Sequence, residues 1–98
     1  MKVLWTPRAI ADLKAISRFI AKDNPHVARI FAGKLKRRAE SLCRLPMRGR
    51  VVPELGRDNI REIIERNYRI AYRIGKDSIT ILTIFEGHKL LQHNSAEE

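Results

Sequence analysis

Cysteine and long apolar runs are the scarcest features of this 98-residue sequence. Cysteine occurs once, at Cys43, so the chain can form no internal disulfide and no thiolate metal site. No apolar stretch approaches the about 18 residues of a membrane span, and the start MKVLWTPRA lacks the apolar core of a signal peptide. We therefore expect a cytoplasmic protein that has no membrane partner.

Acidic residues are also scarce, but only in the first half of the chain. Residues 1–50 hold thirteen Lys and Arg against three Asp and Glu, whereas residues 51–98 hold seven against eight. A body this cationic attracts anionic partners, either nucleic acid or an acidic protein, and repels other cationic surfaces. Charge alone leaves both kinds of partner open.

The length suits one domain with a single modest core. We assign residues 1–91 to that domain and expect the polar end QHNSAEE, residues 92–98, to be a flexible tail. The histidines His26, His88 and His93 show no helical pair and no carboxylate cluster at the spacing of a metal site. The segment GRVVPELG lacks the lysine of a phosphate-binding loop, so neither a metal nor a cofactor is expected.

Two helices are predicted after a short strand at Lys2 to Trp5. Thr6 and Asn24 can each cap a helix, and each is followed by a proline that suits the first helical position. Behind each cap, apolar residues recur at three- and four-residue steps, which predicts one buried stripe per helix and an antiparallel hairpin. The stripes are Ile10, Leu13, Ile16 and Ile20 in the first helix, and Val27, Phe31, Leu35, Ala39 and Leu42 in the second.

Three more strands are predicted after a surface loop that is rich in proline and glycine, PMRGRVVPELG. The strands are IREIIE, YRIAYRI and ITILTIFE, and the turns between them fall at ERN and GKDS. The last strand is apolar at both parities, as in a central strand that is covered on both faces. The order β-α-α-β-β-β predicts an α+β fold, in which a mostly antiparallel sheet packs against the helical hairpin.

The strand YRIAYRI has two different faces. Tyr68, Ile70, Tyr72 and Ile74 should face the core, whereas the other parity should form a cationic outer face with Arg69, Ala71 and Arg73. Its arginines could pair with Glu62 and Glu65 on the neighbouring strand, or they could bind a partner. The pattern leaves both roles open, and it places Arg66 in a solvated turn.

A resemblance to a known family rests on four segments: WTPRAIADLKAISRFIAKDNPHVARIF, LPMRGRVVPELG, IREIIERNYRIAYRI and ITILTIFEG. Together they resemble the ParE/RelE toxin superfamily of type II toxin–antitoxin systems, and are closest to its ParE-like members. The resemblance covers about Trp5 to Leu91 and implies the same fold and a cognate acidic antitoxin, of ParD or RelB type. ParE-like members poison DNA gyrase, whereas RelE-like members cleave messenger RNA on the ribosome. It therefore leaves two activities open, a non-enzymatic gyrase inhibitor and a metal-independent endoribonuclease.

The inhibitor is favoured because the residues for RNA cleavage are incomplete. Cleavage needs a base, an acid and cations around the phosphate. Arg69 matches the family arginine that can hold a phosphate, and the other catalytic candidates follow at the end of the last strand: Glu86, His88 and Lys89. Where RelE-like chains carry lysines on the preceding strand, this chain has Ile60 and Glu62, and no tyrosine follows Tyr72.

The antitoxin is expected to bind along the helical hairpin and at the sheet. An amphipathic acidic segment would place its apolar anchors on the hairpin and its carboxylates against the cations there. Surface ion pairs contribute only about 0.2–1 kcal/mol each, so buried apolar anchors must supply most of the affinity. The predicted contact residues are Arg29, Phe31, Leu35, Lys36, Arg37, Arg38, Arg61 and Arg73.

Overall fold

The computed structural model describes residues 1–87, so His88, Lys89 and the predicted tail lie outside the described part of the chain. The first half contains β1 (Lys2–Trp5), α1 (Pro7–Ala21), α2 (Pro25–Glu40) and two turns of 3-10 helix, η1 (Ser41–Cys43) and η2 (Pro46–Arg48). The second half contains β2 (Arg50–Val51), β3 (Ile60–Glu65), β4 (Tyr68–Ile74) and β5 (Ser78–Glu86). β2 lies in the predicted loop, because two residues are too few to show a strand pattern.

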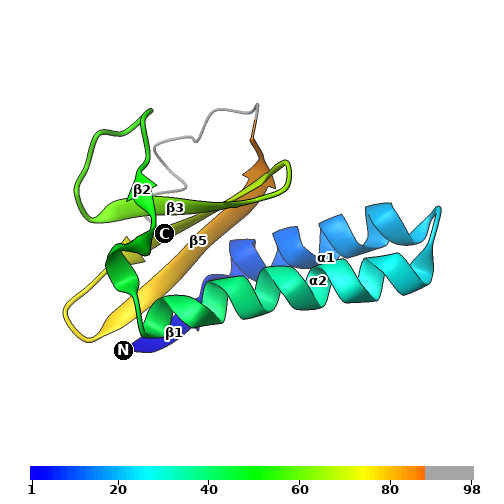
Figure 1. The fold of residues 1–98 in the computed structure, drawn as a ribbon, viewed down its shortest axis with the longest axis horizontal. Coiled ribbons are helices and arrows are strands. Elements are labelled where there is room, and N and C mark those ends of the chain that lie inside the picture. The colour runs from blue at the N-terminus through cyan, green and yellow to red at the C-terminus, as the bar shows by residue number, and fades with distance from the viewer. Residues whose placement is uncertain (88–98) are drawn as a thin grey trace.

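The strands form one five-stranded sheet in the order β1-β5-β4-β3-β2. β1 runs parallel to β5 and the other neighbours are antiparallel, which confirms the predicted α+β fold with a mostly antiparallel sheet. β5 is a central strand, as its apolar residues at both parities predict. Figure 1 shows the helical hairpin on one side of the sheet, with the far ends of both helices extending beyond the strands.

Both helices begin at the predicted caps. The Thr6 hydroxyl oxygen accepts a hydrogen bond from the Ala9 amide at 3.0 Å, and Asn24 caps α2 in the same way. The Thr6 hydroxyl also lies 2.8 Å from the carbonyl oxygen of Leu82, and Asp12 accepts a hydrogen bond from the backbone of β5. The start of α1 is therefore tied directly to the central strand.

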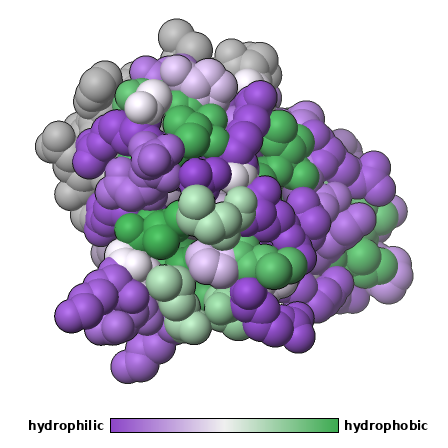
Figure 2. Space-filling model, turned by 60° about the vertical axis from the view of Figure 1, so that its left-hand side comes forward, coloured by the Kyte–Doolittle hydropathy of each residue, from purple (hydrophilic) through white to green (hydrophobic). Residues whose placement is uncertain are grey.

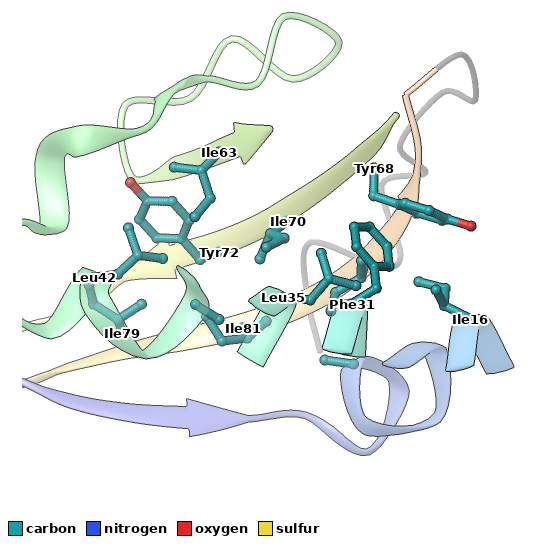
Figure 3. Packing of buried hydrophobic residues seen from close by; sticks show 13 residues of the cluster. Ile16, Phe31, Leu35, Leu42, Ile63, Tyr68, Ile70, Tyr72, Ile79 and Ile81 are labelled. Atoms are coloured by element: carbon teal, nitrogen blue, oxygen red, sulfur yellow. The ribbon is translucent and has the colours of Figure 1, made fainter. Parts of the chain in front are cut away.

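The main core lies between the helical hairpin and the sheet, as Figure 3 shows for Leu35, Phe31 and the strand residues that face them. Most of the predicted stripes are buried there. The first position of each stripe is wrong, because Ile10 is 43% exposed and Val27 is 45% exposed, whereas the neighbouring alanines, Ala9 and Ala28, are buried. Small side chains let a helix approach its neighbours closely, so the buried face begins at the alanines.

A second, smaller core on the opposite face of the sheet overturns the predicted cationic outer face of β4. Ala71 is wholly buried and Arg69 is 5% exposed, so this parity does not face solvent. The cover comes from the segment after β2, which was expected to run over the surface. The apolar residues of this second core are Val52, Ile60, Ala71 and Leu82, with Leu55 and Phe85 packed against them.

Tyr72 fastens the segment between η2 and β2 to the sheet. Its side chain is wholly buried, and its hydroxyl donates a hydrogen bond to the Pro46 carbonyl oxygen at 2.7 Å. The same hydroxyl accepts a hydrogen bond from the Gly49 amide at 2.9 Å. A Cβ atom at Gly49 would lie 2.5 Å from this hydroxyl, so only glycine allows the close approach.

Replacing Tyr72 with phenylalanine should lower the free energy of unfolding by about 1–3 kcal/mol, because the buried Gly49 amide and the partly buried Pro46 carbonyl lose their partner. Burial raises the pKa of the Tyr72 hydroxyl above its ordinary value of about 10. The unfolded chain therefore loses this proton at a lower pH than the folded protein does, so stability falls as the pH rises above about 10. Urea denaturation from about pH 8 to pH 11 should show a steeper loss for the wild type than for Tyr72→Phe. Equal slopes would contradict this assignment.

Candidate functional site

Arg69 lies at the centre of a buried cluster of ion pairs on the second face of the sheet. Its two terminal nitrogens donate to the two carboxylate oxygens of Glu54, each at 2.7 Å, and its Nε donates to Glu62 at 2.6 Å. The guanidinium carbon also lies 4.7 Å from the centroid of the Phe85 ring. Arginine offers a planar fork of donors, and here two carboxylates and an aromatic face already occupy it.

Glu62 is shared between two arginines, because Arg50 donates to its second oxygen through Nε and Nη2, each at 2.7 Å. Arg50 and Glu62 are direct neighbours across β2 and β3, so the short strand β2 places this arginine. The hydrogen bonds that Arg69 donates to Glu54 and Glu62 raise its pKa against the opposing effect of burial, so the guanidinium stays charged. A buried charge that loses its partner is strongly destabilising, so these four side chains hold the loop and the sheet together as a unit.

This arrangement favours one of the two roles that the sequence leaves open for Arg69, which is pairing within the chain. Its side chain is 6% exposed, and a phosphate could reach the guanidinium only by displacing carboxylates that lie within 2.7 Å. Pairing with Glu62 therefore agrees with the cross-strand alternative. Glu65 is different: it lies 3.3 Å from both Lys34 and Arg38, so it pairs with α2.

The other catalytic candidates are only partly placed by the structure. Glu86 ends β5, is half-buried and lies opposite Tyr68 in the sheet register. Burial, and then the charge of Glu86, raise the pKa of the Tyr68 hydroxyl. His88 and Lys89 lie outside the described residues. Of the four candidates, the structure therefore places Arg69 and Glu86, and the first is already bound within the chain.

Arg61 is also used within the chain. It is half-buried, and it donates hydrogen bonds to the Gly49 carbonyl oxygen at 2.9 Å and the Asp58 carbonyl oxygen at 3.1 Å. Arg61 thus fastens both ends of the loop that covers the second face.

Arg73 is half-buried on β4, opposite Ile60 of β3. Arg66 is exposed at the turn between β3 and β4, as predicted, with a φ of 55°.

An apolar groove of about 510 Å³ opens between the far end of the helical hairpin and the β3–β4 turn. Phe19 and Ile30 line it and are 66% and 56% exposed, and Tyr68 and Phe31 lie deeper. Sequence reasoning missed Phe19 and Ile30, because both lie outside the predicted stripes. The sequence feature that could have identified them is an apolar side chain on the helix face where polar residues are expected. We call this feature the hairpin groove.

Neither a group of metal-ligating side chains nor a membrane-spanning helix occurs in the described part of the chain. Within residues 1–87, no three His, Cys, Asp or Glu side chains come close enough to hold a metal ion. No helix in the same range is both long and apolar enough to cross a bilayer.

Comparison with known families shows which family the chain belongs to. The family model for the ParE toxin of the type II toxin–antitoxin system, parDE, matches residues 3–91. The chain belongs to this toxin family. A type II toxin has a cognate antitoxin as its partner, as the sequence resemblance predicts.

Individual proteins are similar to this chain over nearly its whole length. Toxin RelE2 of Caulobacter vibrioides is 36% identical over 90 residues, which are 91% of this chain and 98% of that protein. Y4kP of Sinorhizobium fredii is 32% identical over 91 residues, 90% of each chain. A solved structure of a chromosomal ParDE TA system from P. aeruginosa has a TM-score of 0.73 and 25% identity, and the match covers 88% of this chain and 95% of that one.

Two residues that the sequence predicts as antitoxin contacts are core residues of this ParE-family toxin. Leu35 is wholly buried and has no surface to offer, and Phe31 is 9% exposed at the floor of the hairpin groove. Arg38 is half-buried and donates to the Ile64 carbonyl oxygen at 3.2 Å. The other predicted cations of α2 are exposed: Arg29, Lys36 and Arg37.

Proposed function

We propose that this ParE-family toxin acts in the cytoplasm, where it inhibits DNA gyrase by binding it, and that an acidic antitoxin neutralises it. The observation that carries the proposal is the occupied fork of Arg69, which is bound to Glu54 and Glu62 within 2.7 Å. An enzyme that cleaves RNA needs cations that are open to the phosphate. An inhibitor that acts by binding needs only a packed scaffold and exposed contact surfaces, and the described chain has both.

The test is to follow both possible targets after induction of the toxin. Inhibition of gyrase should stop DNA synthesis within cells and block supercoiling by purified gyrase, while translated messages stay intact. Rapid cleavage of translated messages, with purified gyrase unaffected, would overturn the proposal.

A ribosome-dependent ribonuclease is the second candidate. The observation that favours it is the 36% identity with Toxin RelE2 of Caulobacter vibrioides, whose name places it with the RelE toxins. The same induction experiment separates the two functions, because only a ribonuclease shortens messages. Substituting Glu86 with Gln would then lower the cleavage rate if this half-buried carboxylate handles a proton.

The antitoxin is proposed to place apolar anchors in the hairpin groove and carboxylates on the cations beside it. Lys34 and Arg66 lie at the groove itself, and the exposed cations Arg29, Lys36 and Arg37 continue along α2. Buried apolar anchors carry most of the energy of such helix-in-groove contacts, whereas the charged rim sets rate and specificity.

Replacing Phe19 and Ile30 together with serine should weaken binding of the antitoxin encoded beside this gene by at least about tenfold, because interface anchors contribute more than about 1 kcal/mol each. Isothermal titration calorimetry with the purified antitoxin measures the change. Ile10→Ser is the matched control, since Ile10 is 43% exposed on α1, the helix that carries Phe19, but does not line the groove. An equal loss of affinity in the control would argue against the groove as the antitoxin site.

A further inference from the structure

A second apolar surface lies at the opposite end of α2 from the hairpin groove. Leu45 and Met47 are 54% and 61% exposed, and the exposed Arg44 and Arg48 flank them around Pro46. We call these five residues the η2 patch. Figure 2 turns the face that carries η2 and β2 toward the reader, and apolar side chains gather near its middle with hydrophilic ones around them.

The η2 patch is held firmly although its tip is exposed. The Tyr72 hydroxyl binds the Pro46 carbonyl and the Gly49 amide, so both ends of the turn are tied to a wholly buried ring. Arg48 donates to the Ser41 hydroxyl at 3.0 Å, which ties the turn back to the end of α2. The chain thus fixes a short turn whose two largest apolar side chains contribute little to its own core. A rigid loop that presents apolar side chains to solvent is typical of a binding surface.

The charge of the η2 patch indicates the chemistry of its partner. Arg44 and Arg48 lie on either side of the apolar pair, and the patch itself contains no acidic residue. A complementary surface therefore combines an apolar pocket with carboxylates at its rim. Nucleic acid fits less well, because phosphates would meet the arginines but leave Leu45 and Met47 without a partner.

We propose that the η2 patch is the docking surface for the toxin's protein target. Leu45 and Met47 enter an apolar pocket of that target, and carboxylates of the target line the rim of the pocket. This inference rests on the proposed function, in which the target is gyrase and the inhibition is by binding. The 16 residues of α2 span about 24 Å, so the patch and the hairpin groove are separate surfaces at its two ends. In Figure 1, α2 runs from the loop that joins the two helices to the short turns that precede β2, so the elements that carry the two surfaces lie at its opposite ends. Antitoxin and target thus need not compete for the same side chains.

The experiment compares the wild type with Leu45→Ser/Met47→Ser, Arg44→Glu and the control Ile10→Ser. Each full-length protein is tested for inhibition of supercoiling by purified gyrase, for growth arrest on induction and for antitoxin affinity. We expect the serine pair to need at least about tenfold more protein for half inhibition, with antitoxin affinity changed less than about twofold. Arg44→Glu should show a smaller loss that shrinks at high salt. Ile10→Ser should match the wild type.

The outcomes separate the patch from the proposed function. If the wild type blocks gyrase and the serine pair blocks it equally well, the patch is not the docking surface while the proposed function stands. If the wild type leaves gyrase unaffected but the serine pair still loses growth arrest with antitoxin binding intact, the patch docks another protein target and the gyrase assignment fails. If Arg44→Glu loses activity and the serine pair does not, the ligand is a nucleic acid and the inference is wrong. If the serine pair also loses antitoxin binding, Arg44→Glu alone decides, and unchanged activity in it overturns the inference.

Discussion

Replacing Arg69 with alanine is expected to lower the free energy of unfolding by about 3–5 kcal/mol, because the wholly buried carboxylate of Glu62 and the partly buried one of Glu54 lose a charged partner. Glu62 has no exposed side-chain surface through which water could replace the guanidinium, and Glu54 would lose its bidentate pair. Domains of this size have a total stability of about 5–15 kcal/mol, so the variant should be partly unfolded under mild conditions. Urea denaturation followed by circular dichroism measures the change.

Three further variants show whether the loss comes from the ion-pair cluster. Arg69→Lys keeps a charge but not the planar fork, so it should fall between the alanine variant and the wild type. Adding Glu54→Gln to Arg69→Ala removes the carboxylate that Arg69 holds in its bidentate pair, so the pair of changes should cost less than the sum of the single ones. Arg37→Ala changes an exposed arginine and should stay within about 0.5 kcal/mol. Loss of toxicity in Arg69→Ala without any loss of stability would instead make Arg69 a residue that contacts the target.

The elements with local signals could be predicted from the sequence. Thr6 and Asn24 begin their helices as predicted, because a cap and the proline after it act within one turn of helix. The turn at Arg66 follows from the polar residues between two isoleucine-rich runs. Both parities of β5 are apolar since both faces of the central strand are covered, which confirms the interpretation of that segment.

The second core could not be predicted, because it depends on where a loop folds back. Alternation along β4 shows that Arg69 and Ala71 share a face, but it does not show whether anything covers that face. The residue that matters most, Glu54, precedes Arg69 by 15 positions in a segment without any repeating pattern. Its pairing is a tertiary contact, and sequence spacing supplies no rule for it. An alanine between two arginines was the only local hint of a buried face.

The contact surfaces were hard to predict for a related reason. Periodicity identifies apolar residues that are buried, so it passes over Phe19 and Ile30, which are apolar but break the period of α1 and α2. Periodicity also does not distinguish a stripe that packs on the chain's own sheet from one that is exposed and binds a partner. Leu35 and Phe31 were therefore predicted as docking residues, although the sheet already covers them.

Replacing Leu35 with alanine is accordingly expected to lower the free energy of unfolding by about 2–5 kcal/mol, because the side chain is wholly buried in the main core. Figure 3 shows it among Phe31 and Ile70 between α2 and the sheet. The matched control is Ile30→Ala on the same helix, which is 56% exposed and should change stability by less than about 1 kcal/mol.

The two variants should differ in their effect on antitoxin binding. Leu35→Ala should leave the affinity per folded molecule unchanged at low temperature, whereas Ile30→Ala should lower it, because only Ile30 presents surface to the hairpin groove. Thermal unfolding and calorimetric titration on the same samples separate the two quantities. If Leu35→Ala kept full stability and weakened antitoxin binding, α2 would have to rotate on complex formation and present its buried stripe. In that case the stripe predicted from the sequence would contact the antitoxin in the complex, although it is buried in the free chain.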